Sequence, residues 1–197
     1  MRTITSMKPE YLLPSLELVE QVFTEHENAE EGALVRRLVE EIRSKEYYLP
    51  ELELLMLEDG ELVGYVMFSR FHIEGRYTDR LVILTPAAVR TDKQRQHISR
   101  DLIDYGLHKA AEMGFTAALV EGNPRNYRSR GFKTSKPYGI VAHESVGLPH
   151  EDCMMVTELV PGGLDGMHGE VEYASTYETL RRRSITLPSV LHASHSP

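Results

Sequence analysis

The chain has 197 residues, of which 41% are hydrophobic and 26% are charged, and its formal net charge is −8. That length predicts one domain with a full-sized core. The acidic balance argues against non-specific binding to DNA or to an anionic membrane. No apolar run approaches the ~18–20 residues that a membrane-spanning helix needs.

The first ten residues, MRTITSMKPE, contain no apolar stretch of the kind found in a signal peptide. Cys153 is the only cysteine, which excludes an internal disulfide framework and is typical of a reducing compartment. We therefore expect a cytoplasmic protein that has no membrane partner and no nucleic-acid partner.

Two helices are predicted before residue 45, at 14–25 and 31–44, joined by the acidic connection EHENAE. Their apolar residues recur at helical spacing: Leu16, Val19 and Phe23 in the first, and Leu34, Leu38 and Ile42 in the second. Residues 51–71 then form two strand-like runs around Asp59-Gly60, a dipeptide that favours a tight hairpin turn.

The second half of the chain begins with a predicted strand–helix–strand unit. RLVILTPAAV (80–89) is typical of a buried strand, 98–113 of an amphipathic helix ended by Gly114, and 115–120 of another strand. CMMVTELV and GEVEYAST are two further possible strands, and the segment from Arg181 is polar and irregular. Hairpins combined with one crossover predict a mixed sheet covered by helices.

The loop before the helix at 98–113 is the first candidate binding site. A helix start offers unpaired N–H groups and about half a positive charge, which suits an anion, and Arg95 and Arg100 bracket this one. Every crossover helix has such an end, however, and most bind only water.

A second segment, farther along the chain, favours a binding function for this loop. QRQHIS (94–99) is followed by NPRNYRSRGF (123–132), and the pair resembles the GNAT superfamily of N-acetyltransferases. That family grips acetyl-coenzyme A with a Q/R-x-x-G-x-G/A loop after its fourth strand. A Y-x-x-x-G-F segment follows its fifth strand, matched here by Tyr127, Gly131 and Phe132. The ending ELVPGGLDGMHGEVEY is similar to that of a bacterial, YhbS-like subgroup.

The resemblance implies an α/β fold with a mixed, mostly antiparallel central sheet covered by helices, the acyl-CoA N-acyltransferase (GNAT) fold. It implies an N-acetyltransferase domain at residues 1–178 and leaves 179–197 as a loosely structured C-terminal tail. The cofactor-binding residues that it implies are Ala88, Val89, Gln94, Arg95, Gln96, His97, Ile98, Ser99, Arg100, Asn123 and Tyr127. Asn123 could instead cap the short helix after it, the commoner task of asparagine.

His97 and Ser99 depart from the family, because they stand at its two glycine-type positions. One interpretation keeps the loop's shape: backbone N–H groups of 95–99 bind the phosphates while the side chains point outward. His97 would then adopt right-handed helical geometry, or stack beside the cofactor. The other interpretation is a degenerate site. We expect the first, since a loop whose φ angles stay negative does not require glycine.

Tyr127 is the predicted catalytic residue, because the family's tyrosine at this position protonates the departing thiolate, and a phenol is protonated at neutral pH. The alternative is a tyrosine that only packs beneath the cofactor. The general base is not readable from the sequence. The weaker candidates are Glu25, His26, Glu27, Glu30, Glu31, His72 and Glu74, and water could serve instead.

The sequence therefore predicts an N-acetyltransferase that moves acetyl from acetyl-coenzyme A to an amine by direct attack in a ternary complex. The acceptor is a small-molecule or peptide amine, no metal is expected, and a homodimer is possible. The alternative is a non-catalytic acyl-CoA-binding or regulatory module with a degenerate pyrophosphate loop. A protein-interaction domain that has lost the cofactor is a third interpretation.

Overall fold

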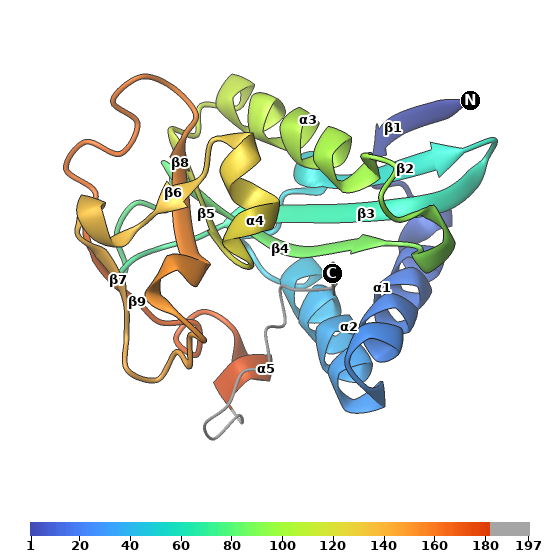
Figure 1. Ribbon diagram of the computed structural model, residues 1–197, viewed down its shortest axis with the longest axis horizontal. Helices are drawn as coiled ribbons and strands as arrows, with labels where there is room; N and C mark the ends of the chain where they lie inside the picture. Colours follow the sequence, from blue (N-terminus) through green and yellow to red (C-terminus); the bar gives the residue numbers. More distant parts are fainter. Residues whose placement is uncertain (182–197) are drawn as a thin grey trace.

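The computed structural model describes residues 1–181 and is built on a seven-stranded sheet (Figure 1). The strand order is β1-β2-β3-β4-β5-β8-β6, and every neighbouring pair is antiparallel except β4 with β5. The strands are β1 (Arg2–Ser6), β2 (Glu53–Glu58), β3 (Glu61–Arg70), β4 (Leu81–Val89), β5 (Ala117–Glu121), β6 (Lys133–Thr134) and β8 (Met154–Glu158). The predicted mixed, mostly antiparallel sheet is thus confirmed.

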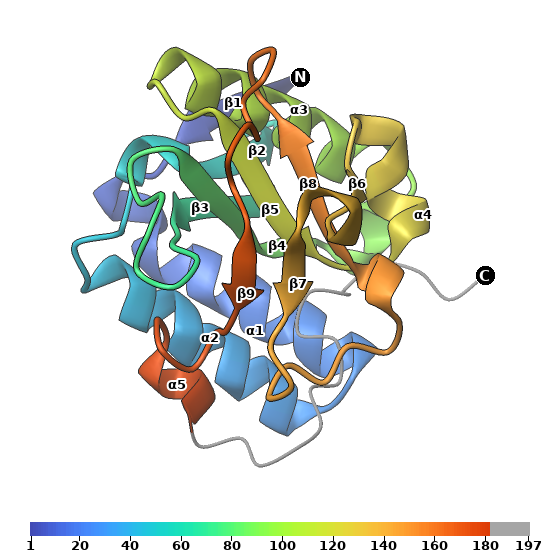
Figure 2. The same ribbon diagram turned by 90° about the vertical axis from the view of Figure 1, so that its left-hand side faces the viewer.

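A second, two-stranded parallel sheet pairs β7 (Ile140–Ala142) with β9 (Gly169–Val171) beside the main sheet (Figure 2). The sequence analysis did not predict β1, β6 or β7. All three are short, and β1 lies at an edge with side chains that are exposed or half-buried, so it lacks the apolar alternation that marks a strand in sequence. Pairing with β2, more than fifty residues away, creates it.

Helices cover both faces of the main sheet (Figures 1 and 2). α1 (Leu12–His26) and α2 (Ala29–Arg43) lie on one face, and α3 (Ile98–Glu112) lies on the other. The remaining helices are α4 (Pro124–Tyr127), α5 (Glu178–Arg181), and the 3-10 turns η1 (Pro9–Tyr11), η2 (Pro50–Leu52), η3 (Thr91–Lys93), η4 (Arg128–Arg130), η5 (Lys136–Tyr138) and η6 (Glu151–Cys153). The three long helices agree with the predicted segments to within two residues at each end.

The sheet separates two hydrophobic clusters. One packs the inward side chains of α1 and α2, such as Phe23 and Val35, against alternate strand residues including Leu119. The other packs α3 against the opposite face. α3 lies close to β3 because Gly64 has no side chain: a Cβ there would lie 2.5 Å from Ile98 at the first turn of α3. The start of α3 is thereby fixed over the sheet.

β4 and β5 run side by side for only a few residues. Their last pair is Ile83 with Leu119, so the second half of β4 has no strand partner on that side within residues 1–181. A bulge in β3–β4 pairing between Val66 and Phe68 faces the same stretch, where Pro86 carries no N–H group. β4 and β5 therefore diverge where β4 leads into α3.

The C-terminal part of the predicted tail lies outside the described residues, at 182–197. Before it, α5 packs on α2, where two backbone N–H groups, of Glu178 and Thr179, donate to the Glu41 carboxylate at 2.7 Å. Among residues 1–181, no helix is both long enough and apolar enough to cross a membrane.

Candidate active site

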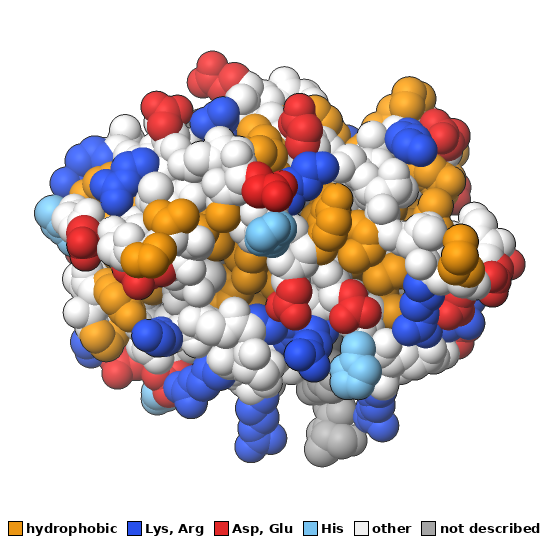
Figure 3. Space-filling view, turned by 90° about the horizontal axis from the view of Figure 1, so that it is seen from above, with side chains coloured by type: hydrophobic (Ala, Val, Ile, Leu, Met, Phe, Trp, Pro, Cys, Tyr) orange, Lys and Arg blue, Asp and Glu red, His pale blue; other side chains and the backbone are white. Residues whose placement is uncertain are grey.

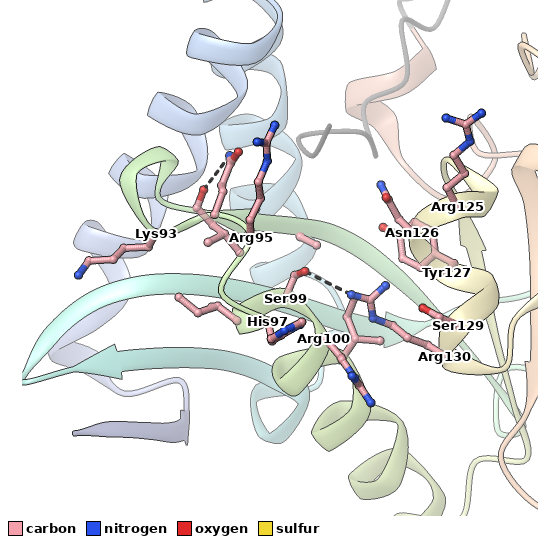
Figure 4. Close-up of a pocket in the computed structure, with 15 residues that line it drawn as sticks. Lys93, Arg95, His97, Ser99, Arg100, Arg125, Asn126, Tyr127, Ser129 and Arg130 are labelled. Atoms are coloured by element: carbon pink, nitrogen blue, oxygen red, sulfur yellow. Dashed lines mark hydrogen bonds between the residues drawn. The ribbon is translucent and has the colours of Figure 1, made fainter. Parts of the chain in front are cut away.

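A cavity of about 410 Å³ opens between the end of β4, the start of α3, and α4 with η4 (Figure 4). It collects eight of the residues that the sequence predicted: Val89, Gln94, Arg95, His97, Ile98, Ser99, Arg100 and Tyr127. Seven lining residues were not predicted: Ala87, Lys93, Ile103, Arg125, Asn126, Ser129 and Arg130. Three predicted residues, Ala88, Gln96 and Asn123, are not among the residues that line it.

The loop before α3 has an unexpected backbone. Arg95 has φ 60° and His97 has φ 65° and ψ 6°, so both lie in the left-handed region. The expectation that φ stays negative, and that His97 adopts right-handed helical geometry, is therefore wrong. The loop keeps the conformation that glycine would adopt without strain, and histidine is one of the residue types that tolerate it best.

That conformation has a chemical consequence. Residues 95 and 97 have positive φ, whereas Gln96 between them does not. A left-handed residue next to a right-handed one can direct successive backbone N–H groups toward one point and so form a small anion-binding hollow. It lies directly before the first turn of α3, where further N–H groups are unpaired. The positive φ angles of Arg95 and His97 are therefore compatible with an anion site at this loop.

Contacts from distant parts of the chain hold the loop. Arg2 on β1 donates from Nη1 to the backbone oxygen of Gln96 at 2.9 Å, and also bonds the Gln96 side chain. Its Nε donates to Glu58 at 2.7 Å, which fixes the guanidinium on the sheet. Gln96 therefore anchors the loop from outside the cavity.

The other end of the loop is tied to α1. The Gln94 Nε2 atom lies 2.6 Å from His26 Nε2 and donates to the Val89 oxygen at 3.4 Å. The Thr91 hydroxyl donates to Glu25, and this hydrogen bond, followed by one from Gln21, lowers the pKa of the Glu25 carboxyl. Two of the acidic-connection candidates for a base, Glu25 and His26, thus support the loop.

The cavity is positively charged. Five Lys or Arg residues and His97 line it, and no Asp or Glu does: Lys93, Arg95, Arg100, Arg125 and Arg130. Lys93 pairs with Glu58 at 2.5 Å, and Arg100 approaches Asp104 at 3.6 Å. The side chains of Arg95 and Arg125 have no acidic partner within residues 1–181 and rise on opposite sides of the cavity in Figure 4.

This charge is local. In the space-filling view over α3, acidic and basic side chains alternate, with hydrophobic ones between them, and no single charge dominates the surface (Figure 3). Five cationic side chains and no carboxylate lining one cavity of an acidic chain favour an anionic ligand in that cavity.

Arg130 reaches across the cavity. Its Nη2 donates to the Ser99 hydroxyl at 3.4 Å (Figure 4), while its Nε is buried and has no hydrogen-bond partner in the described chain. Burial lowers the pKa of the guanidinium, and the nearby Tyr127 and Asp104 offset only part of this effect. Arg128 points elsewhere and pairs with Asp152 at 3.1 Å. Both arginines lie in the segment NPRNYRSRGF, but only the fold shows which one faces the cavity.

Tyr127 forms the inner wall of the cavity. Only 4% of it is exposed, and it packs edge-on against Phe132 with ring centroids 5.8 Å apart. Gly122 makes room for it, because a Cβ there would lie 2.3 Å from the tyrosine ring. Burial raises the pKa of the Tyr127 hydroxyl to about 12, although Arg130 opposes part of that rise. The hydroxyl therefore keeps its proton at neutral pH.

Asn123 and Ala88 have structural positions. The Asn123 side chain accepts a hydrogen bond from the Arg125 N–H at 3.0 Å and caps α4, as the capping alternative predicted. Ala88 is buried in the cluster under α1 and α2, while Ala87 and Val89 on either side of it line the cavity. Side chains alternate along a strand, so the neighbours of Ala88 are the ones that face the cavity.

Of the remaining base candidates, Glu74 is committed elsewhere, since it pairs with Arg76 at 2.8 Å and accepts from the Glu170 N–H at 2.9 Å. The Cys153 thiol is buried, and burial raises its pKa, which disfavours a reactive thiolate.

Glu121, at the end of β5, is a buried ionisable residue that the sequence did not single out as a candidate. It is 2% exposed, and burial raises the pKa of its carboxyl to about 7, partly opposed by the neighbouring Tyr173 hydroxyl. A charged residue that ends the apolar run AALV was the available signal.

Comparison with known proteins shows which family the chain resembles. Residues 16–133 match the profile described as the "Acetyltransferase (GNAT) family". The chain is 29% identical over 119 residues to "Uncharacterized N-acetyltransferase YhbS" of Escherichia coli K12, covering 59% of this chain and 67% of that protein. It is 28% identical over 153 residues to "Uncharacterized N-acetyltransferase YjhQ" of the same organism, covering 77% and 82%.

Solved structures share the fold. The crystal structure of E. coli YhbS in complex with CoA superimposes with a TM-score of 0.78 and 24% identity, over 93% of this chain and 94% of that one. A GNAT family acetyltransferase from Brucella melitensis in complex with acetyl-CoA gives a TM-score of 0.67 and 23% identity, over 88% and 96%. The family profile, which spans more than half of the chain, establishes that the protein is a member of the GNAT family of N-acetyltransferases.

Proposed function

We propose that the protein transfers the acetyl group of acetyl-coenzyme A to an amine acceptor, a small molecule or a peptide, by direct attack while both substrates are bound. The observation that carries the proposal is the cavity at the start of α3, which gathers five cationic side chains and no carboxylate, with Tyr127 at its inner wall. Coenzyme A carries phosphates at one end and a thioester at the other, and this arrangement offers a group for each.

The residues present fit the phosphates. The N–H groups of the hollow at 95–97 and of the first turn of α3 would hold the pyrophosphate, with Arg95 and Arg130 adding charge-assisted hydrogen bonds. The buried Arg130 Nε, which lacks a partner among the described residues, would gain one. Arg125, on the opposite wall, is placed for a further phosphate.

The second half of β4 would bind the pantetheine arm. Arg90 donates its N–H to the Val63 oxygen of β3, so Val89, one residue earlier, directs its backbone groups away from β3, as its bond from Gln94 also indicates. Ala87 has the same orientation. These groups face the side on which β5 has diverged, and they could hydrogen-bond an amide-bearing arm and polarise a carbonyl.

Tyr127 would supply the proton that the departing thiolate needs. Its hydroxyl is protonated at neutral pH and lies in a buried environment, where a positioned donor contributes more than in water. The chain thus provides an anion clamp, backbone donors and an acid, which is what direct acyl transfer requires from a protein.

A non-catalytic acyl-CoA-binding module is the second candidate, and the histidine at a glycine-type position motivates it. The loop geometry weakens this motive, since His97 adopts the conformation that glycine would adopt at this position. What separates the two functions is whether Tyr127 acts on the thioester.

The experiment is a pair of measurements on the full chain. Calorimetry with coenzyme A tests the cavity, and release of free thiol from acetyl-coenzyme A is then followed against a panel of amines. Binding together with amine-dependent thiol release is the expected result. Binding without release from any amine would favour the regulatory module, and absence of binding would exclude both.

A further inference from the structure

The loop that leads into α3 holds two residues in the left-handed region without glycine. Arg95 has φ 60° and His97 has φ 65°. For a residue that carries a Cβ atom, this conformation costs free energy, because the Cβ comes too close to the following carbonyl oxygen. Such residues persist where the surrounding structure holds them in place. The conformation of this loop therefore needs support from contacts outside the loop.

Arg2 on β1 provides that support. Its Nη1 donates to the backbone oxygen of Gln96 at 2.9 Å, and its Nη2 donates to the Gln96 side-chain oxygen. Within residues 1–181, no other hydrogen bond joins 95–97 to a segment outside the loop and α3. Arg2 is therefore the residue that ties the left-handed part of the loop to the sheet.

The bond from Arg2 sets the direction of one peptide group. The backbone oxygen of Gln96 and the N–H of His97 belong to the same peptide unit, and in a trans peptide these two groups point in opposite directions. Neither Arg2 nor Gln96 lines the cavity, whereas His97 does. Holding the oxygen on the outer side, toward Arg2, thus turns the His97 N–H away from Arg2 and toward the cavity.

The Arg2 guanidinium is itself held in place. Its Nε donates to the Glu58 carboxylate at 2.7 Å, and Arg2 and Glu58 are paired across the β1–β2 ladder. Lys93 contacts the same carboxylate at 2.5 Å. Hydrogen bonds from Lys93 and then from Arg2 lower the pKa of the Glu58 carboxyl to about 2, so it stays ionised at any pH near neutral. The planar fork of arginine can thus serve the sheet and the loop together.

We propose that Arg2 is a positioning residue for coenzyme A and takes over the task of the glycines that this loop lacks. It does not contact the cofactor; it holds the peptide between Gln96 and His97 with the N–H group turned toward the pyrophosphate. The inference rests on the proposed binding of coenzyme A at this loop, for which it names the residue that keeps the loop ready to bind.

The test begins with Arg2→Lys, which keeps the charge but replaces the planar fork with a single ammonium group. A loss of affinity in this variant cannot come from weaker attraction of the phosphates. The matched control is Arg36→Lys on α2, since Arg36 pairs with Glu20 at 2.7 Å and with Glu40 at 3.5 Å. The Arg36 side chain is 28% exposed and that of Arg2 is 31% exposed, so the two substitutions disturb ion pairs of similar burial.

Calorimetry measures coenzyme A affinity for each full-length protein. Arg2→Lys should lose about tenfold in affinity, the loss that follows if only about a tenth of the free molecules keep the binding-competent loop. Arg36→Lys should bind like wild type. Hydrogen exchange of the backbone amides of 95–99, measured without ligand, should become faster in Arg2→Lys and stay unchanged in Arg36→Lys.

A second substitution separates positioning from a general loss of stability. His97→Gly is made in wild type and in Arg2→Lys, because glycine adopts the left-handed conformation without strain. The glycine should improve coenzyme A binding more in the Arg2→Lys background than in wild type, by about threefold or more, since coupled residues depart from additivity. A variant that was merely destabilised would show no such coupling.

Equal coenzyme A affinity in wild type and Arg2→Lys would overturn the proposal, and so would an equal loss in Arg36→Lys. Equal effects of His97→Gly in the two backgrounds would also overturn it. If Arg2→Lys does not fold, Gln96→Ala decides: it keeps Arg2 and removes one of its two acceptors in the loop, and unchanged affinity overturns the proposal. Wild type that binds no coenzyme A rejects the proposed function together with this inference, whereas the other outcomes reject the inference alone.

Discussion

The two faces of the central sheet differ in the sign of the charge that lacks a partner near β4 and β5. On the α3 face, five cationic side chains and no carboxylate line the cavity around a helix start. On the α1–α2 face, the buried carboxyl group of Glu121 has no cationic partner within residues 1–181. The sheet therefore separates a cationic cavity on one face from a buried carboxyl group without a counter-charge on the other, near the point where β4 and β5 diverge.

The largest expected effect comes from removing the acid on the α3 face. Tyr127→Phe keeps the ring that packs on Gly122 and Phe132 and deletes only the hydroxyl. We expect kcat to fall by about 10²-fold or more, with little change in coenzyme A affinity. Steady-state kinetics and calorimetry on the same variant test this. A parallel loss of affinity would instead make Tyr127 a packing residue.

The buried carboxyl group of Glu121, on the opposite face, should make the free energy of unfolding depend on pH. The folded-state pKa of Glu121, about 7, lies above the ordinary glutamate value of 4.5, so the folded protein binds this proton more tightly than the unfolded chain does. Its contribution to stability is therefore fully present below pH 4.5 and is lost as the pH rises to 7.

Glu121→Gln should consequently be more stable than wild type at pH 8, by about 3 kcal/mol, and nearly equal at about pH 3.5. Urea unfolding at the two pH values measures this difference, with Glu112→Gln as the exposed control. Equal stability of Glu121→Gln and wild type at pH 8 would mean that the carboxyl group is not held in an uncompensated site.

Charge reversal in the cavity should weaken the donor side alone. Arg95→Glu places an acid beside the hollow at 95–97, and coenzyme A affinity should fall by about 1–3 kcal/mol, the value of one charge-assisted hydrogen bond. Arg37→Glu on the exposed side of α2 is the control. Calorimetry at two salt concentrations should show a weaker salt dependence for Arg95→Glu than for the control. Unchanged affinity would place the phosphates elsewhere.

The smallest effect concerns the loop backbone. His97 has φ 65°, a conformation that glycine adopts without strain, so His97→Gly should raise the free energy of unfolding by up to about 1 kcal/mol. Coenzyme A affinity should stay equal or improve, because the N–H groups keep their direction. A large loss of affinity would show instead that the imidazole ring contacts the ligand.

The order of elements was largely predictable. Apolar spacing indicated the three long helices, and Asp59-Gly60 indicated the turn between β2 and β3, because these signals depend on residues close in sequence. The motif around Tyr127 predicted the tyrosine that lines the cavity. The same local reasoning failed for β1, which has little apolar periodicity and exists through its pairing with β2.

The sequence by itself determined the family, the succession of helices and strands, and the types of side chain available near the helix start. The tertiary structure decided the rest. His97 adopts a positive φ in a loop held by Arg2, which lies 94 residues from Gln96 in the chain. Arg130 faces the cavity while Arg128 does not, and Glu121 is buried without a cation in residues 1–181. Such outcomes depend on contacts between distant segments and on burial, which residue spacing does not encode.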